Sequence, residues 1–239
     1  SSLGAYLTEV YGRYGYAANL GYSLVMEGIT GAEMVRRLMD RLRQQPPAAV
    51  AGRAVRRASD FWDERRFGPI RSDTDRSSRN FLQLEYDHDL HVAVRPSGTE
   101  PKIKFYVEQV FDPAPTWAGT GFAAARKEMD EATRDLTLAF VDQVLRLADI
   151  HLSRPALLVS SLVSLDNRSD FATRFLAELE ARLRSASTAD QLAAWVDERL
   201  KAYGSDPRDL VRAGVAAHFD TQELTAGQSR LLRTVFSLS

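Results

Sequence analysis

The stretch from residue 91 to residue 108 constrains the fold most, because two apolar, β-prone segments flank a loop of chain-breaking residues. Val92–Val94 and Ile103–Val107 have the apolar pattern of strands, and two prolines and a glycine lie between them. Proline removes a ladder hydrogen bond and glycine permits a sharp change of direction, so the ladder cannot run through the loop. We therefore predict a strand, a sharp loop and a second strand.

The loop between these strands has the composition of an anion site. Arg95 can offer a planar, bidentate fork, and Ser97 and Thr99 each offer a hydroxyl. Gly98 lets backbone N–H groups approach a ligand without a Cβ in the way. This inventory suits a phosphate monoester, and a purely structural turn is the alternative.

Residues 95–101 read Arg-Pro-Ser-Gly-Thr-Glu-Pro and resemble the phosphate-binding loop of the α-D-phosphohexomutases, the phosphoglucomutase and phosphomannomutase family. In that family the loop lies in the fourth and last domain and grips the phosphate that is not being transferred. The next residues, Lys-Ile-Lys-Phe-Tyr, look more like phosphoglucomutases than like phosphomannomutases. The resemblance implies these phosphate-binding residues: Arg95, Ser97, Gly98, Thr99 and, at a position that is basic in only some members, Lys104.

The resemblance also implies an activity for a longer protein, which would interconvert hexose 1-phosphate and hexose 6-phosphate through a bisphosphate intermediate. The family's catalytic phosphoserine, magnesium site and sugar-reading loop belong to earlier domains. We therefore expect no catalytic residue and no metal site in this chain, and no mutase activity of the chain alone. Mg²⁺ and glucose 1,6-bisphosphate are expected cofactors of the longer protein and are not expected to bind here. The expected partners are the hexose phosphate and the upstream domains of the same polypeptide.

The order of the predicted elements fits an α+β fold, in which an antiparallel sheet carries helices on one face and an all-α bundle follows. The resemblance implies the last phosphohexomutase domain, whose sheet is like that of the TATA-binding protein. Residues 1–15 are expected to end the preceding third domain or to form a linker helix, so that the chain begins inside a longer protein. Residues 16–151 are the expected phosphate-binding domain, and residues 152–239 a helical extension of unknown role.

The spacing of apolar residues predicts the elements of both parts. Before residue 152 we expect strands at 17–27, 50–58 and 80–86 and helices at 3–14, from Thr30, and at 118–151. After it we expect helices at 155–165, 171–184, 189–203, 207–218 and 226–236. The expected N-caps of these later helices are Ser169 or Asp170, Thr188, Asp206 and Thr225.

Charge and composition exclude several classes of protein. The net charge of -1, with both signs spread along the chain, argues against a nucleic-acid partner. The sequence has no cysteine, and therefore no disulfide or thiolate metal site. It has no run of about 18 apolar residues that would cross a membrane, so a cytoplasmic protein is expected.

Two sets of polar residues could be mistaken for metal ligands. Asp73-Thr-Asp75-Arg resembles part of the family's magnesium loop, but Arg71 stands where the first aspartate would be. We therefore expect an ordinary polar surface loop over residues 56–80. The four histidines lack metal-site spacing, and only His91, just before the loop, is considered as a sensor of bound phosphate.

Two other functions stay open beside the mutase hypothesis. The chain could be a non-catalytic sugar-phosphate-binding module, or an assembly element whose residues 152–239 make oligomer contacts. For residues 152–239 we expect a scaffold or oligomer contact, with a regulatory role as the alternative.

Overall fold

The computed structural model describes residues 2–114, 117, 121–185 and 188–238. The chain divides into two compact units, one formed by Ser1–Tyr22 and Val35–Asp149 and the other by Ser23–Met34 and Ile150–Ser239. The boundaries of the units fall inside strand β1 (Tyr16–Val25) and helix α2 (Gly28–Gln44). The domain limits expected at residues 16 and 152 stay a prediction.

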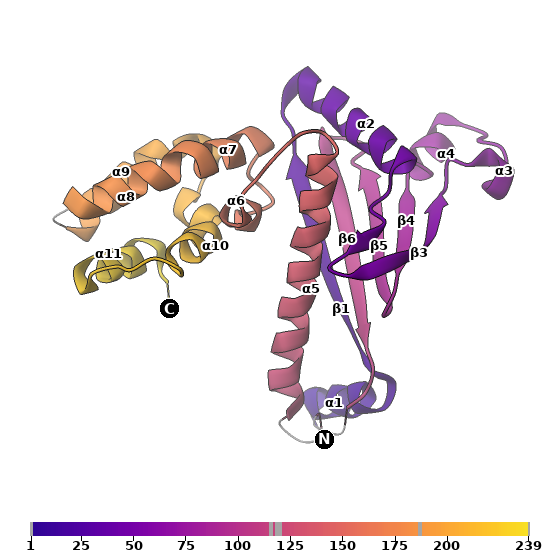
Figure 1. Ribbon diagram of the computed structural model, residues 1–239, viewed down its shortest axis with the longest axis horizontal. Coiled ribbons are helices and arrows are strands. Elements are labelled where there is room, and N and C mark those ends of the chain that lie inside the picture. Colours follow the sequence, from indigo (N-terminus) through magenta and orange to yellow (C-terminus); the bar gives the residue numbers. More distant parts are fainter. Residues whose placement is uncertain (1, 115–116, 118–120, 186–187, 239) are drawn as a thin grey trace. The chain divides into compact units, whose positions relative to one another are not determined.

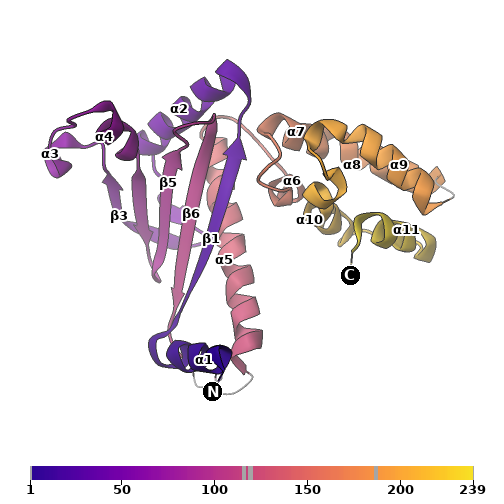
Figure 2. The ribbon, with the colours of Figure 1, turned by 180° about the vertical axis from the view of Figure 1, so that it is seen from behind.

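A six-stranded antiparallel sheet forms the frame of the first unit, with the strand order β1-β6-β5-β4-β3-β2 (Figures 1 and 2). The strands after β1 are β2 (Ala49–Val50), β3 (Arg53–Asp60), β4 (Leu82–Tyr86), β5 (Leu90–Pro96) and β6 (Lys102–Phe111). Each strand from β2 to β5 pairs with the next one along the chain, and β1 joins the edge beside β6. The strand, loop and strand predicted around residues 91–108 are confirmed.

Alternation along the central strands turns one face of the sheet toward the core. The buried residues on that face are Leu90, Val92 and Val94 of β5 and Ile103, Phe105 and Val107 of β6. Helix α5 (Gly121–Arg146) covers this face, and its Phe140 packs edge to face on Phe105 with ring centroids 6.0 Å apart. Helix α2 lies on the same face (Figures 1 and 2). The predicted α+β class, with helices on one face of an antiparallel sheet, is confirmed.

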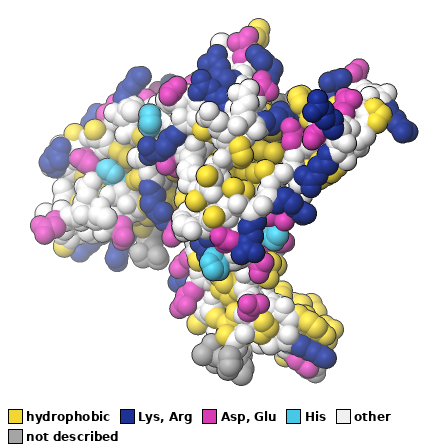
Figure 3. Space-filling model, turned by 45° about the vertical axis from the view of Figure 1, so that its right-hand side comes forward, with side chains coloured by type: hydrophobic (Ala, Val, Ile, Leu, Met, Phe, Trp, Pro, Cys, Tyr) yellow, Lys and Arg dark blue, Asp and Glu magenta, His cyan; other side chains and the backbone are white. Residues whose placement is uncertain are grey.

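Helix α1 (Leu3–Tyr14) packs through only one of its faces at one end of the sheet. Tyr11 stacks on Phe122 of α5 with ring centroids 4.9 Å apart. On its other face Leu3, Tyr6 and Tyr14 are exposed, and Figure 3 shows hydrophobic side chains at this end of the unit.

The expected polar loop over residues 56–80 is wrong, because most of this segment is regular structure. Its beginning belongs to β3, and the remainder contains the short helices α3 (Glu64–Phe67) and α4 (Asp73–Ser78). The side chain of Asp63 accepts a hydrogen bond from the N–H of Arg65, which caps α3. Ser72 caps α4 in the same way. Both helices are too short to show an apolar stripe, which explains why periodicity did not reveal them.

The second unit is a bundle of helices, as predicted. Its elements are α6 (Arg154–Leu158), α7 (Leu165–Asp170), a π-helix (Phe171–Phe175), α8 (Leu176–Ser185), α9 (Ala189–Arg199), a 3-10 turn (Lys201–Tyr203), α10 (Pro207–Phe219) and α11 (Ala226–Phe236). Thr188, Asp206 and Thr225 are confirmed as N-caps. The caps expected at Ser169 or Asp170 are wrong, since that helix begins at Leu165 with Ser164 as its cap. Helix α2 likewise begins at Gly28, before the expected cap Thr30.

The helix expected at 155–165 ends at Leu158, where a buried arginine binds a carbonyl group of the helix and two of the segment that follows it. The Arg168 side chain is fully buried and donates hydrogen bonds to the carbonyls of Ala156 (2.9 Å), Ser160 (2.8 Å) and Val163 (3.1 Å). These bonds replace the partners that another helical turn would provide. These carbonyl groups therefore keep a hydrogen-bond donor although the helix does not continue.

Within the described parts of the chain, no helix is both long enough and apolar enough to span a bilayer.

Candidate anion-binding site

The β5–β6 hairpin closes in a short, hydrogen-bonded loop made of residues 97–101. At the base of the loop, the N–H of Ser97 donates a hydrogen bond to the carbonyl of Lys102 (2.8 Å). The N–H of Lys102 donates to the carbonyl of Glu100 (2.8 Å). Hydrogen-bonded and non-bonded pairs alternate along an antiparallel ladder, so the next pair, Pro96 with Ile103, is a non-bonded one. The missing N–H of Pro96 therefore leaves the ladder intact.

Arg95 and Lys104 face each other across the hairpin, on the side of the sheet turned away from the core helices. Opposite residues in such a pair have Cα atoms about 5.5 Å apart. Both side chains are partly buried, and neither forms a hydrogen bond or an ion pair with a residue that the structure describes. Like charges directly opposite each other destabilise a sheet, so a bound anion would relieve their repulsion.

Several cations of the sheet have carboxylate partners. Lys102 pairs with Glu100 at the loop and is the main reason that the pKa of Glu100 lies below its ordinary value, with a smaller contribution from Lys104. On β3, Arg56 is paired with Asp87 and Arg57 with Glu85, whereas Arg53 has no ion pair with a described residue. On the face seen in Figure 3, basic and acidic side chains are interleaved. Among the arginines and lysines of the hairpin itself, Arg95 and Lys104 are therefore the two without an ion pair to a described residue.

The loop adds two hydroxyl groups to this charge. Ser97 is partly buried and Thr99 is exposed, and neither hydroxyl is bonded to any residue in the described ranges. A hydroxyl can donate one hydrogen bond and accept others, so both are available to an oxyanion.

Gly98 is a glycine that the fold does not require. Its φ lies outside the left-handed region, and a Cβ built on it would meet only the hydroxyl of Ser77, at an ordinary contact distance of 3.7 Å. The chain itself would therefore accept a side chain here, which leaves close approach of a ligand to the backbone as the physical use of this glycine. All five predicted residues thus lie at one end of one hairpin.

The aspartates of α4 are engaged within their own segment. Asp75 accepts a hydrogen bond from the backbone N–H of Arg71 (2.9 Å) and lies 3.8 Å from the guanidinium of Arg79. Across the residues that the structure describes, no group of three or more His, Cys, Asp and Glu side chains is placed to hold a metal ion.

His91 lies away from the loop, further along β5. His91 is paired in register with Glu85 on one side and with Glu108 on the other. It stands four residues before Arg95, about 13 Å along the strand at about 3.3 Å per residue. A bound phosphate would therefore have to act on His91 over this distance. The carboxylates of Glu85 and Glu108 are much closer to His91. His218, which the sequence did not single out, contacts Glu180 at 2.7 Å in the second unit.

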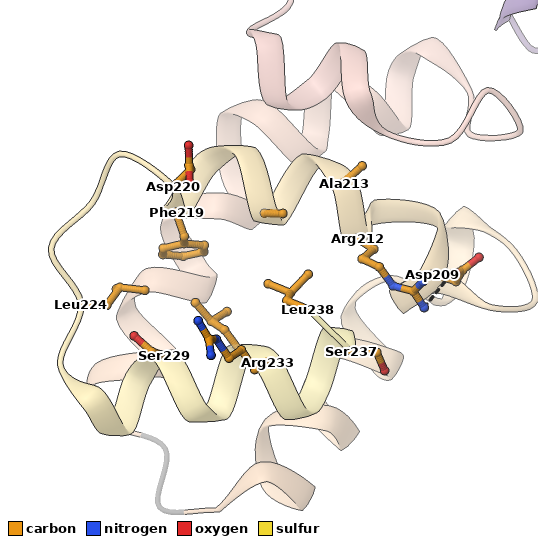
Figure 4. A pocket seen from close by; sticks show the side chains of 12 residues that line it. Asp209, Arg212, Ala213, Phe219, Asp220, Leu224, Ser229, Arg233, Ser237 and Leu238 are labelled. Atoms are coloured by element: carbon orange, nitrogen blue, oxygen red, sulfur yellow. Dashed lines mark ion pairs between the residues drawn. The ribbon is translucent and has the colours of Figure 1, made fainter. Parts of the chain in front are cut away.

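A cavity of about 710 Å³ lies in the second unit between α10 and α11. Figure 4 shows Phe219, Leu224 and Leu238 around it, with Arg233 at α11 and an ion pair between Arg212 and Asp209. Two arginines, two aspartates and two serines contribute to its lining, so its formal charges balance, and Arg212 is already paired with Asp209. Unlike the hairpin, the cavity therefore offers no excess of positive charge to an anion.

Comparison with known proteins connects the hairpin to a family. Residues 34–114 match the family described as "Phosphoglucomutase/phosphomannomutase, C-terminal domain", which covers β2 to β6 and most of α2. Phosphoglucomutase from Staphylococcus aureus strain N315 is 30% identical over 104 residues, which are 42% of this chain and 19% of that protein. Phosphoglucomutase from strain USA300 is 29% identical over the same length.

The matched region contains the whole candidate site, and the chain spans about a fifth of the length of these relatives. The fold of the first unit and the position of the hairpin within the matched residues agree with this assignment. Residues 34–114 of this chain therefore match the C-terminal domain of phosphoglucomutases and phosphomannomutases.

Proposed function

We propose that the β5–β6 hairpin binds the phosphate group of a hexose phosphate, through Arg95, Ser97, Gly98, Thr99 and Lys104. The observation that carries this proposal is the pair Arg95 and Lys104, which are register partners without a carboxylate from the described residues. A phosphate monoester has close to two negative charges and three acceptor oxygens, which match a guanidinium fork, an ammonium group and two hydroxyls.

The proposed role of this site is to hold the substrate, since none of its groups is a nucleophile next to a base. We propose that it acts within a longer phosphoglucomutase or phosphomannomutase, which interconverts hexose 1-phosphate and hexose 6-phosphate through a bisphosphate. Phosphoryl transfer depends on position and charge stabilisation. Tight binding of the phosphate that does not react would hold the substrate so that its reacting group is correctly aligned for transfer.

The other parts of the reaction would come from outside this chain. The described residues offer no group of three or more metal-ligating side chains for Mg²⁺, so other domains of the longer protein would hold it, with glucose 1,6-bisphosphate as the second expected cofactor. We propose the upstream domains as partners of this chain and the cytoplasm as its compartment. The preference for phosphoglucomutase chemistry over phosphomannomutase chemistry is supported by the names of the relatives.

Titration of the full chain with glucose 1-phosphate tests the binding proposal, with the backbone amide signals of Gly98 and Thr99 followed by NMR. Arg95→Ala should weaken binding by about 10- to 150-fold, because hydrogen bonds to charged groups contribute about 1.5–3 kcal/mol. Arg95→Lys should recover only part of the affinity, since an ammonium cannot form the bidentate fork.

Arg57→Ala is the matched control for these variants. Arg57 lies on the same sheet, but its guanidinium is already paired with Glu85, so its removal should leave the affinity unchanged. Wild-type protein that shows no shift of the loop signals, or Arg95→Ala protein that binds as well as wild type, would overturn the proposal.

A mutase assay tests whether this chain alone has the activity that we propose for the longer protein. With Mg²⁺, glucose 1,6-bisphosphate and glucose 1-phosphate, we expect no turnover by this chain alone. Turnover would show that the chain carries a complete catalytic site and that its role is wider than binding.

A further inference from the structure

Helix α4 stands at the end of the sheet where the β5–β6 hairpin turns (Figures 1 and 2). Three serines belong to this helix or cap it, and two of their hydroxyls serve the helix itself. Ser72 accepts a hydrogen bond from the N–H of Asp75 (3.1 Å), and Ser78 donates to the carbonyl of Asp75 (2.9 Å). The hydroxyl of the third, Ser77, forms no bond to a residue in the described part of the chain.

This uncommitted hydroxyl lies beside the loop. Apart from the two chain neighbours of Gly98, the Oγ atom of Ser77 is the one heavy atom of the described residues within 4 Å of the place where a Cβ would stand, at 3.7 Å. Ser77 and Gly98 are 21 positions apart in the sequence, so only the packing of α4 against the hairpin brings them together. The side of Gly98 that has no Cβ is therefore lined by a hydrogen-bond donor.

Several contacts hold α4 in this position. The indole N–H of Trp62 donates to the carbonyl of Arg76 (2.9 Å), which ties α4 to the end of β3. The Arg79 guanidinium donates to the carbonyls of Phe61 (2.8 Å) and Gly68 (2.9 Å). The guanidinium of Arg43 in α2 lies over the Trp62 ring, 4.2 Å from its centroid. A donor that its surroundings hold in place loses little entropy when it binds a ligand.

We propose that Ser77 is a further phosphate-binding residue, which donates a hydrogen bond to the phosphate monoester from the α4 side of the loop. This inference rests on the proposed function of the hairpin and adds one position to it. Arg95, Lys104 and the loop hydroxyls all belong to the hairpin, whereas a tetrahedral phosphate has oxygens pointing in several directions. A hydroxyl from a separate element supplies a donor that the hairpin lacks.

The test uses the full chain, glucose 1-phosphate as ligand and the same NMR titration. Ser77→Ala should weaken binding by about 3- to 10-fold, as expected for loss of one hydrogen bond of about 0.5–1.5 kcal/mol. Ser77→Thr, which keeps a hydroxyl, should bind within about twofold of wild type. Ser77→Asp should weaken binding more than Ser77→Ala, because a carboxylate repels the phosphate.

Ser78→Ala is the matched control, because it removes a hydroxyl from the same turn that is used inside α4. We expect it to bind like wild type. If Ser77→Ala binds as wild type while Arg95→Ala does not, the role of Ser77 is refuted and the proposed function of the hairpin stands. If Ser77→Ala and Ser78→Ala lose affinity equally, Ser77 acts only through the structure of α4, and the inference is again overturned. If the wild-type chain gives no titration at all, both proposals fall.

Discussion

Arg95 on β5 and Lys104 on β6 are direct register partners, two cations side by side, and neither forms an ion pair or a hydrogen bond with a described carboxylate. Elsewhere on the same sheet the arginines Arg56 and Arg57 are each paired with a carboxylate. The repulsion between Arg95 and Lys104 would be present in the free protein, and the proposed phosphate would remove it. Stability and ligand affinity should therefore respond to changes at this pair in opposite directions.

Lys104→Gln should make the ligand-free chain more stable and its phosphate binding weaker. Removal of one of two opposed like charges is expected to raise the free energy of unfolding by about 0.2–1 kcal/mol at low salt. Urea denaturation with and without glucose 1-phosphate measures both effects. Lys127→Gln on α5, where the lysine lies 3.9 Å from Glu131, is the control and should not gain stability. A ligand-free Lys104→Gln chain that is less stable than wild type would contradict the repulsion argument.

Gly98→Ala should weaken ligand binding without lowering the free energy of unfolding. A Cβ at this position has only one ordinary contact, so the free energy of unfolding should stay the same or rise by about 0.4–1 kcal/mol. Affinity for glucose 1-phosphate should fall by about tenfold or more, which corresponds to at least about 1.4 kcal/mol. Gly21→Ala in β1, where a Cβ would meet open space, is the matched control and should change neither quantity greatly. A marked loss of stability in Gly98→Ala would instead assign this glycine to the fold.

Arg168→Met should destabilise the helical unit strongly. The substitution leaves the carbonyls of Ala156 and Val163, which are buried, and that of Ser160, which is partly buried, without their donor, and each buried unsatisfied group costs about 1–3 kcal/mol. We expect a loss of about 3 kcal/mol or more in urea denaturation, followed by far-UV circular dichroism. Arg168→Lys should recover little, since one ammonium group cannot reach carbonyls that a planar fork spans.

Arg174→Met is the control for Arg168→Met, because the side chain of Arg174 is 74% exposed. We expect this change to alter the free energy of unfolding by less than about 0.5 kcal/mol. An Arg168→Met protein as stable as the Arg174→Met protein would show that the segment around Ser160 is held by other contacts.

Glu180 should make stability depend on pH in the acid range. Gln222 and His218 both hydrogen-bond to its carboxylate, and these bonds lower the pKa of Glu180 in the folded state below its ordinary value of 4.5. Since the folded pKa is below the unfolded one, the contribution is complete above about pH 4.5 and is lost as the pH falls through the folded pKa. The stability difference between wild type and Glu180→Gln should therefore be larger at pH 7 than at pH 3.

Glu223→Gln is the control for this measurement, because Glu223 is exposed on the same unit. Its stability difference from wild type should be independent of pH over the same range. An equal pH dependence for the two variants would mean that the contacts of Glu180 with Gln222 and His218 contribute nothing to folding.

The sequence predicted the hairpin and the groups that its loop carries, because both depend on residues that are close together along the chain. Alternation in Val92–Val94 and Ile103–Val107 specifies the strands, and the breakers between them specify the loop. The caps Thr188, Asp206 and Thr225 were also predictable, since a capping side chain bonds to an N–H only three residues further on. Helix α4 was missed because six residues are too few to show a helical period.

The sequence by itself determined that Arg95, two hydroxyls and a glycine stand together in one loop, since neighbours in a short loop cannot separate. Only the tertiary structure decided that Arg95 and Lys104 lack carboxylate partners among the described residues, because Arg56 and Arg57 carry the same charge and do have them. It also decided that Ser77 lies beside Gly98 and that Arg168 is buried. Local pattern specifies which groups are present, whereas strand register and helix packing join distant segments and so determine which groups remain unpaired.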